Sequence, residues 1–361
     1  MSDALLDLGQ LQWIGFHGRR VSAALQARIA AGRCGATIVF KRNLVIAGDV
    51  ADLDALCRLT EELHGAAPDG TPCLVAVDQE GGLVQRVRSP ATVWPPMRSH
   101  DHAANAEQLA ERVGLALGTE LHALGFDIDF APVLDIHTNP ANPIIGDRAF
   151  GTEPDLTATR ALAFARGLAA AGVLACGKHF PGHGDTSTDS HLELPRVEHA
   201  MERVERVELV PFAAAARAGL PMIMTAHVVF PAIDPDVPAT LSHAAITGLL
   251  RTKLGYRGVI ISDDLDMKAI ADPPSAAIAA IRAGCDVLLL CNNEATQDAV
   301  DAALRKELER SSEFRERVGE AAARVRAMKR AHAESKIARP ARDVVGSAEH
   351  RALADQLRDS P

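Results

Sequence analysis

Aromatic residues are scarce in this sequence of 361 residues, at 4%, and they include a single tyrosine. Large rings are the usual platform on which the ring of a ligand stacks. Only Trp13 and Trp94 could supply such a platform here. Any stacking site is therefore expected to involve one of these two residues.

Long apolar runs are also missing, since no stretch reaches the roughly 18 residues that a membrane-spanning helix needs. The most apolar stretch, 276–291, is interrupted by Arg282 and Asp286. The first residues show no basic segment followed by an apolar one, which is the mark of a secretory signal. We therefore expect no contact with a membrane and a cytoplasmic location.

The chain has no excess of positive charge, because 38 lysine and arginine residues face 47 aspartate and glutamate residues, for a net charge of −9. Binding to nucleic acid requires a basic surface, so this class of partner is disfavoured. The six cysteines are scattered and form no Cys-x-x-Cys motif. We interpret them as small buried hydrophobic residues of a reducing compartment, and not as a disulfide or zinc framework.

What the sequence does contain is a repeated alternation of apolar runs and helical periodicity. The apolar runs are continuous, which is typical of strands buried on both faces. This alternation predicts an α/β protein with a single (β/α)8 TIM-type catalytic barrel over residues 1–334 and a linker with a short C-terminal helix or tail over 335–361. An open doubly wound sheet is the alternative, although no Gly-x-Gly-x-x-Gly follows the first strand. The predicted strands are 11–16, 36–40, 73–77, 128–134, 173–176, 222–226, 259–261 and 287–291.

Between these strands we expect helices, and one more helix follows the last strand. Leucine and valine recur every three or four residues in 105–125, for example, as an amphipathic helix requires. The predicted helices are 22–33, 49–65, 105–125, 154–171, 199–218, 242–254, 275–284, 295–310 and 313–334, with a short polar helix at 345–358.

Polar and ionisable residues follow most of the predicted strands. In a (β/α)8 barrel the active site lies at the C-terminal ends of the strands, and the strand starts show no such enrichment. We therefore expect these side chains to converge on one active site. They are Asp78, Glu80 and Arg86 after the third strand, Asp135 and His137 after the fourth, Lys178 and His179 after the fifth, His227 after the sixth, Asp263 and Asp264 after the seventh, and Asn292 and Asn293 after the eighth.

The richest of these ends is the stretch 176–191, which holds three histidines, two aspartates and a lysine. Its glycines and its proline exclude a helix, so we expect a shaped polar loop. Asp189 and His191 lie two residues apart, and in extended backbone their side chains face the same way. The carboxylate could then orient the imidazole toward a substrate. An Asx turn with an independent histidine is the alternative.

The histidines of this loop could instead bind a metal, together with Asp189. Their spacing matches none of the usual short metal motifs, so we expect no metal and no other cofactor. A metallohydrolase remains the alternative.

Two further groups of residues suggest a sugar as the substrate. Asp263 follows a run of β-branched residues and is the candidate catalytic carboxylate, whereas Asp264 is better suited to cap a helix that starts near Leu265. Asp78 can accept hydrogen bonds from two hydroxyls, and the side chains of the cationic residues offer several donors. The cationic residues are Arg86, Arg148 and Lys178.

Taken together, these residues resemble the bacterial β-N-acetylglucosaminidases of glycoside hydrolase family 3, the cell-wall recycling type. The most specific match is Lys-His-Phe-Pro-Gly-His-Gly at 178–184 with Asp-Ser-His at 189–191. Further matches are Val-Asp-Gln-Glu-Gly-Gly at 77–82, Phe-Ala-Pro-Val-Leu-Asp at 130–135, Gly-Asp-Arg at 146–148, Met-Thr-Ala-His at 224–227 and Ser-Asp-Asp-Leu at 262–265. Many relatives carry an arginine where this chain has Leu83.

The resemblance implies a monomeric exo-β-N-acetylglucosaminidase that releases terminal β-linked N-acetylglucosamine from 1,6-anhydro-muropeptides with retention of configuration. It implies Asp263 as the nucleophile that forms a covalent glycosyl-enzyme, and His191 as the general acid/base, oriented by Asp189. It also implies that the sugar is bound by Asp78, Arg86, Arg148, Lys178 and His179, to which we add His227. The alternatives are a β-N-acetylglucosaminide phosphorylase, a β-glucosidase and a sugar sensor without catalysis.

Overall fold

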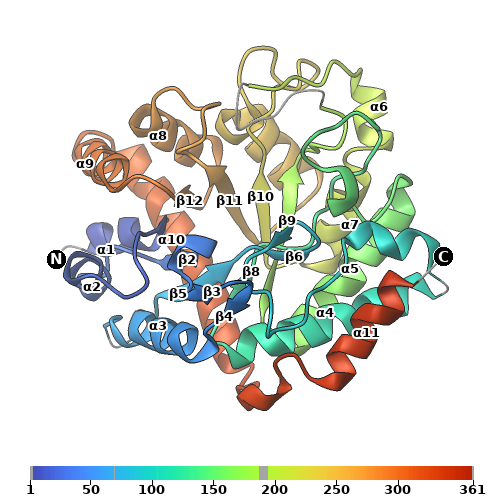
Figure 1. The fold of residues 1–361 in the computed structure, drawn as a ribbon. Helices are drawn as coiled ribbons and strands as arrows, with labels where there is room; N and C mark the ends of the chain where they lie inside the picture. Colours follow the sequence, from blue (N-terminus) through green and yellow to red (C-terminus); the bar gives the residue numbers. More distant parts are fainter. Residues whose placement is uncertain (1–2, 69, 104, 187–193, 360–361) are drawn as a thin grey trace.

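The computed structural model describes residues 3–359 except 69, 104 and 187–193. Eight parallel strands close into a barrel, and each is hydrogen-bonded to the next along the chain. The predicted (β/α)8 fold is thus confirmed (Figure 1). The barrel strands are β1 (Gln12–Gly15), β2 (Ala36–Val39), β5 (Leu74–Val77), β8 (Ile128–Asp129), β9 (Leu174–Phe180), β10 (Met222–Thr225), β11 (Val259–Asp264) and β12 (Val287–Leu290).

Helices surround the barrel, and six of those in the described residues begin at side chains that cap their free N–H groups. Asp52 caps α3, and Asn293 caps α9 by accepting from the N–H groups of Ala295 and Thr296. The helices are α1 (Asp3–Gln10), α2 (Ala23–Ala30), α3 (Leu53–Gly65), α4 (Ala106–Ala123), α5 (Pro154–Ala170), α6 (Met201–Arg206), α7 (Val210–Ala218), the π-helix η5 (Ala244–Lys253), α8 (Pro273–Ala283), α9 (Glu294–Arg310), α10 (Ser312–Glu334) and α11 (Ala348–Arg358).

Short elements complete the chain between these helices and strands. Two hairpins, β3–β4 and β6–β7, follow β2 and β5, and five short 3-10 turns occur elsewhere in the described residues. The hairpin strands are β3 (Ile46–Ala47), β4 (Val50–Ala51), β6 (Gln79–Gly81) and β7 (Val84–Gln85). The 3-10 turns are η1 (Lys41–Asn43), η2 (Met97–His102), η3 (Gly146–Arg148), η4 (Ala239–Leu241) and η6 (Arg342–Val344).

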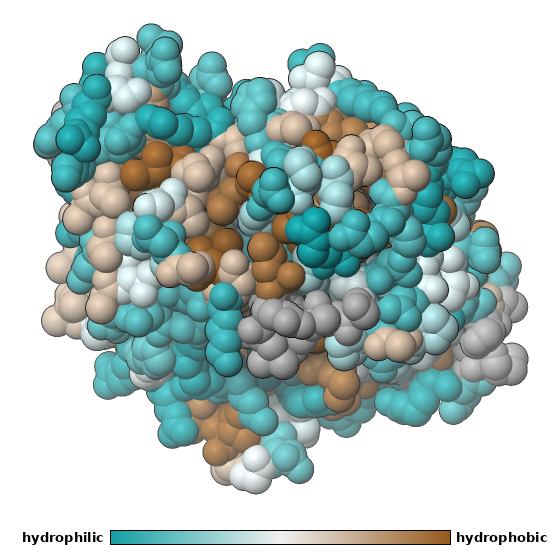
Figure 2. Space-filling view, turned by 90° about the horizontal axis from the view of Figure 1, so that it is seen from above, coloured by the Kyte–Doolittle hydropathy of each residue, from teal (hydrophilic) through white to brown (hydrophobic). Residues whose placement is uncertain are grey.

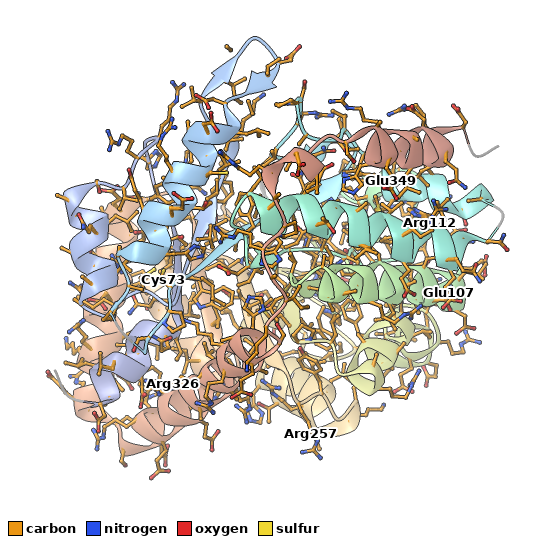
Figure 3. The ribbon with its side chains drawn as sticks, turned by 90° about the horizontal axis from the view of Figure 1, so that it is seen from below. Cys73, Glu107, Arg112, Arg257, Arg326 and Glu349 are labelled. Carbon is orange, nitrogen blue, oxygen red and sulfur yellow. The ribbon has the colours of Figure 1, made fainter. Side chains whose placement is uncertain are left out.

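The interior of the barrel is filled by alternate side chains of its strands, and α10 closes its N-terminal end. Val325 of α10 is buried in the same cluster as Trp13 and Ile38, and Met328 packs against that cluster. Burying this apolar surface stabilises the closed barrel, at roughly 25 cal/mol per Å². Figure 3 shows this end from below, with α10 running across it. The opposite end of the barrel stays open.

The C-terminal segment packs closely on the barrel helices. Glu120 of α4 accepts a hydrogen bond from the backbone N–H of Gly346 and contacts Nδ1 of His350 at 2.8 Å. Leu353 and Leu357 of α11 are buried. The segment 345–358, expected as a short polar helix or tail, contains the helix α11 from Ala348 to Arg358, which packs on α4 (Figures 1 and 3).

The structure corrects several predicted boundaries. The strand expected at 128–134 is only Ile128–Asp129, and Pro132, which has no N–H to donate, lies in the irregular part. In contrast, β9 continues to Phe180, so the loop expected from Gly177 begins four residues later. The helix expected at 199–218 is two helices, α6 and α7.

Candidate active site

A cavity of about 510 Å³ lies at the C-terminal ends of the strands. These ends point to the top of Figure 1, and Figure 2 shows this face with hydrophobic and hydrophilic residues mixed near its centre. The prediction that polar strand ends converge is confirmed for most of them. The cavity is lined by Asp78, Glu80, Arg86, Arg148, Lys178, His179, His183, Asp263, Asp264, Asp266, Lys268 and Asn292, together with apolar residues that include Phe40, Phe130 and Met267.

Asp78 and two cations form the first polar cluster of the cavity. Oδ1 of Asp78 accepts from Nζ of Lys178 at 2.9 Å, and Oδ2 accepts from Nη2 of Arg86 at 3.0 Å. Burial alone would raise the pKa of Asp78, but Lys178 and Arg86 outweigh it and hold this pKa well below its ordinary value. Asp78 is therefore ionised, and both of its oxygens are oriented.

Glu80 forms the second cluster; the sequence placed it among the polar strand ends but gave it no individual role in binding or catalysis. Arg148 donates to it twice, from Nε to Oε2 at 2.8 Å and from Nη2 to Oε1 at 2.9 Å. Lys178 is also close to Oε1 of Glu80. Burial opposes ionisation of Glu80, but Arg148 and Lys178 lower its pKa to about 2. The bidentate pair fixes the plane of the Arg148 guanidinium at the cavity wall.

These carboxylates also keep the cations charged inside the barrel. Burial would lower the pKa values of Lys178 and Arg148, but Asp78 and Glu80 outweigh it for Lys178, and Glu80 does so for Arg148. Both pKa values lie above their ordinary values, although the side chain of Lys178 is only 3% exposed. The wall of the cavity thus carries fixed donors and fixed acceptors in alternation, which suits a ligand rich in hydroxyl groups.

Asp135 orients the histidines of the cavity. Its Oδ2 accepts from Nδ1 of His179 at 2.7 Å, and its Oδ1 accepts from the backbone N–H of His183 at 2.6 Å. Asp135 is fully buried, which opposes ionisation, but His179 and His183 lower its pKa. The contact with Asp135 fixes the orientation of the His179 ring at the cavity wall.

His183 lies beside His179, with ring centroids 5.9 Å apart in an edge-to-face arrangement. Burial, aided by His179, lowers the pKa of His183 to about 4, so its ring is neutral at neutral pH. The following Gly184 is required by close approach, because a Cβ there would lie 1.7 Å from the carbonyl oxygen of Ile136. The chain after β9 is therefore packed tightly against the segment that follows β8.

Asp263 and Asp264 end β11 in different roles. Asp263 lines the cavity, and its Oδ1 accepts from the backbone N–H of Asp264 at 2.8 Å. Asp264 accepts from the backbone N–H groups of Asp266 and Cys291, both at 3.0 Å, and from Nδ2 of Asn292 at 2.8 Å. The expected helix near Leu265 is wrong, so Asp264 secures a turn to the end of β12 and caps no helix.

The surroundings of Asp264 also affect its ionisation. Burial is the main cause that raises the pKa of Asp264 to about 7, and the neighbouring carboxylates of Asp266 and Asp263 act in the same direction. The carboxylate of Asp263 thus lies next to a second carboxyl group that is partly protonated at neutral pH.

His227 was expected to bind the sugar, and the structure places it just outside the described lining of the cavity. It is fully buried and is not among the residues that line the cavity. Its Nδ1 lies 2.9 Å from Oγ1 of Thr240, and its Nε2 lies 3.0 Å from the backbone carbonyl oxygen of Asp264. His227 therefore contacts the backbone at the end of β11.

The two candidates for a stacking platform are not in the cavity. Trp13 fills the barrel interior at 0% exposure, and Trp94 is 1% exposed. Phe40 and Phe130 line the cavity instead, and the guanidinium of Arg42 lies 4.3 Å from the ring centroid of Phe40. Their rings were not distinguishable in the sequence from ordinary core phenylalanines.

Asp189 and His191, the predicted orienting carboxylate and general acid/base, lie outside the described residues. In 3–186 and 194–359, apart from residues 69 and 104, no group of three or more His, Cys, Asp or Glu side chains is arranged to hold a metal ion. Within the same residues, no helix is both long and apolar enough to cross a bilayer.

Comparison with known proteins identifies the family to which this chain is similar. Residues 5–328 match the family described as "Glycosyl hydrolase family 3 N terminal domain". A β-hexosaminidase of Alkalilimnicola ehrlichii is 42% identical over 306 residues, which cover 82% of this chain and 84% of that protein. A β-hexosaminidase of Pseudomonas aeruginosa is 42% identical over 275 residues, which cover 75% of this chain and 79% of that protein.

Solved structures agree with these relatives. A glycoside hydrolase family 3 β-N-acetylglucosaminidase from Paenibacillus sp. superposes with a TM-score of 0.91 at 37% identity, over 100% of this chain and 69% of that one. NagZ from Neisseria gonorrhoeae, in complex with N-trifluoroacetyl-D-glucosamine, superposes with a TM-score of 0.73 at 31% identity, over 87% of this chain and 98% of that one. The barrel, the polar cavity at its open end and the match along most of the chain lead to one conclusion: the chain belongs to glycosyl hydrolase family 3 and is a glycoside hydrolase.

Proposed function

We propose that the protein is an exo-β-N-acetylglucosaminidase that removes terminal β-linked N-acetylglucosamine with retention of configuration. The observation that carries the proposal is that Asp263 shares one cavity with the Asp78 and Glu80 clusters. Three cations and two ionised carboxylates there offer donors and acceptors for sugar hydroxyls, and Asp263 supplies a nucleophile beside them. The names of the similar β-hexosaminidases support the amino sugar as the substrate.

In the proposed mechanism, Asp78, Arg86, Arg148, Lys178 and His179 hold the hydroxyl groups of the terminal sugar. Binding at these fixed groups places the anomeric carbon near Asp263, which attacks it and forms a covalent glycosyl-enzyme. His191, oriented by Asp189, protonates the leaving oxygen and then deprotonates the incoming water. An imidazole suits both steps, because its ordinary pKa lies near neutral pH.

The backbone around Asp263 supports the role of nucleophile. One carboxylate oxygen, Oδ1, accepts the N–H of Asp264, and this bond fixes the rotation of the side chain. His227 in turn contacts the carbonyl oxygen of Asp264, so we assign His227 a positioning role in place of sugar binding. Through this arrangement the carboxylate of Asp263 is oriented for attack on the anomeric carbon.

For the natural substrate we propose 1,6-anhydro-muropeptides of cell-wall recycling, processed by a monomer in the cytoplasm. Support comes from the similarity to NagZ structures and from the resemblance of the 178–184 motif to the cell-wall recycling type. The test uses two disaccharide substrates that share the terminal N-acetylglucosamine, one with anhydro-muramic acid and one with a second N-acetylglucosamine. Equal kcat/KM for the two would contradict the muropeptide assignment.

The activity itself is tested with aryl glycosides. We expect the purified protein to release phenol from an aryl β-N-acetylglucosaminide and not from the matching β-glucoside, and we expect the first sugar product to be the β-anomer. Preference for the glucoside would overturn the proposal in favour of a β-glucosidase. Phosphate should not accelerate turnover, and a sugar 1-phosphate as the main product would identify a phosphorylase instead.

A further inference from the structure

The barrel end opposite the cavity holds two cysteines whose sulfur atoms are in contact. Cys34 and Cys73 directly precede Gly35 and Leu74, at the starts of the neighbouring parallel strands β2 and β5. Their Sγ atoms are 3.9 Å apart, and all six cysteines of the chain are free thiols. Figure 3 views this end from below and labels Cys73.

We propose that Cys34 and Cys73 form an oxidation site, at which a peroxide converts the two thiols into a disulfide between β2 and β5. A disulfide requires a sulfur–sulfur distance of about 2.05 Å. Since β2 and β5 are hydrogen-bonded from Ala36↔Leu74 onward, the two backbones are already held at neighbouring positions. Rotation of the two side chains therefore has to supply most of the decrease in the distance between the two sulfur atoms.

The polar surroundings distinguish the two thiols. The thiol of Cys73 lies 3.9 Å from the sulfur of Cys34, and the Cys34 thiol donates to the carbonyl oxygen of Ala36 at 3.0 Å. Burial would raise the pKa of Cys34, but the Cys73 thiol, Arg28 and Lys329 outweigh it and lower this pKa. The pKa of Cys73 is raised, first by the hydrogen bond to Cys34 and then by burial. Cys34 is therefore the attacking sulfur and Cys73 the resolving one.

Lys329 of α10 gives this site its positive charge. Its Nζ donates to the carbonyl oxygens of Gly35 at 2.6 Å and Pro72 at 2.7 Å, the residues next to the two cysteines. It also donates to Oε1 of Gln10 at 2.8 Å. An ammonium group with three neutral acceptors and no carboxylate among them favours a thiolate nearby.

The chemistry needs a peroxide as the oxidant and proceeds in two steps. The Cys34 thiolate attacks one oxygen of hydrogen peroxide, so that an S–O bond forms, the O–O bond breaks and hydroxide leaves. The sulfur of Cys73 then attacks the sulfur of the Cys34 sulfenic acid. The S–S bond forms, the S–O bond breaks, and the leaving hydroxide takes the thiol proton and departs as water. The two thiols are oxidised, and the peroxide is reduced to water.

Burial determines the rate and the consequence of this reaction. Cys34 is 3% exposed and Cys73 is 1% exposed, so we expect slow oxidation limited by local opening at this end of the barrel. The disulfide would close a loop that contains β2, the β3–β4 hairpin and α3. It should raise the melting temperature by restricting the unfolded chain. The cavity lies at the other end of the barrel, so glycosidase activity should persist.

The experiment treats the whole protein with hydrogen peroxide, alkylates the remaining thiols after unfolding, and identifies cross-linked peptides by mass spectrometry. We expect one Cys34–Cys73 cross-link, four alkylated cysteines and a melting temperature that rises and returns on reduction. Cys73→Ser should abolish the cross-link, and the matched control Cys57→Ser, at another buried cysteine, should retain it.

The proposal is overturned if the wild-type protein shows six alkylated cysteines, a different cross-link, or Cys34 oxidised to sulfinic acid with Cys73 still free. This result can be read from the wild-type protein alone, even where a variant fails to fold. It is also independent of the substrate, because the cross-link is measured without any turnover.

Discussion

Glu80→Gln is the substitution that tests the electrostatic wall of the cavity most directly. The Glu80 side chain is 2% exposed and lies between Arg148 and Lys178. These cations lower its pKa from an ordinary 4.5 to about 2. At about 1.4 kcal/mol per pKa unit, ionised Glu80 contributes about 3 kcal/mol to folding at neutral pH. Removing one partner of a buried ion pair costs roughly the same, about 3–5 kcal/mol.

Glutamine keeps the shape of the side chain but directs an amide donor at the cationic donors around it. We therefore expect Glu80→Gln to lower the free energy of unfolding by about 3 kcal/mol at pH 7, and the melting temperature by on the order of 5 °C. The KM for an aryl β-N-acetylglucosaminide should rise, because Arg148 loses its bidentate partner. Urea unfolding followed by circular dichroism measures the first quantity, and initial rates measure the second.

The pH dependence gives an independent check. Since the pKa of Glu80 is lower in the folded protein than in the unfolded chain, its contribution is complete above about pH 4.5 and is lost as the pH falls toward 2. The difference in the free energy of unfolding between wild type and Glu80→Gln should therefore be smaller at about pH 3 than at about pH 5.

A surface ion pair supplies the control for this experiment. Glu111 pairs with Arg166, and both side chains are about half exposed. Exposed pairs contribute about 0–1 kcal/mol, so Glu111→Gln should be almost silent. A Glu80→Gln protein as stable as Glu111→Gln at pH 7, or a gap that does not change with pH, would refute the reasoning.

Three further predictions concern single carboxylates. Asp263→Ala should reduce kcat by at least about 10³-fold while the circular dichroism spectrum is unchanged, and turnover within tenfold of wild type would exclude Asp263 as nucleophile. Asp135→Asn should remove the carboxylate that orients the His179 ring and lower kcat/KM by about 10–100-fold. An unchanged kcat/KM would show that Asp135 is not the residue that orients His179. Burial raises the pKa of Asp129 well above its ordinary value, and its Oδ1 accepts the N–H of Gln79. Because this pKa is higher in the folded protein than in the unfolded chain, stability should decline as the pH rises above about 4. Asp129→Asn should therefore melt at the same or a higher temperature than wild type at about pH 8, and a clear loss of stability in this variant would contradict the raised pKa.

The barrel and most of its site could be predicted because both depend on patterns that are local in the sequence. Eight apolar runs with helical periodicity between them leave few ways to bury the strands on both faces. In a parallel barrel the residues that follow the strands, such as Asp78 and Asp263, must lie at the same end. The errors were also local, since β9 continues through Lys178 and His179 where glycine and proline suggested a loop.

The roles of Glu80, Asp135 and His227 could not be read in this way, because each depends on which partner faces it across the fold. Glu80 lies 68 residues from Arg148 along the chain, and Asp135 lies 44 residues from His179. The same residue types at the same strand ends are compatible with facing the cavity or the packed layer beneath it. Only the folded structure shows that His227 is fully buried and contacts the carbonyl oxygen of Asp264.

The sequence by itself determined the class of fold, the end of the barrel that holds the site and the residue types available for sugar chemistry. These follow from hydrophobic periodicity and from chain connectivity, which can be recognised in short stretches of the sequence. The tertiary structure decided which charges are paired, which carboxyl groups are ionised and which cysteines touch. Those properties depend on distances and burial between segments far apart in the chain, and no local pattern specifies them.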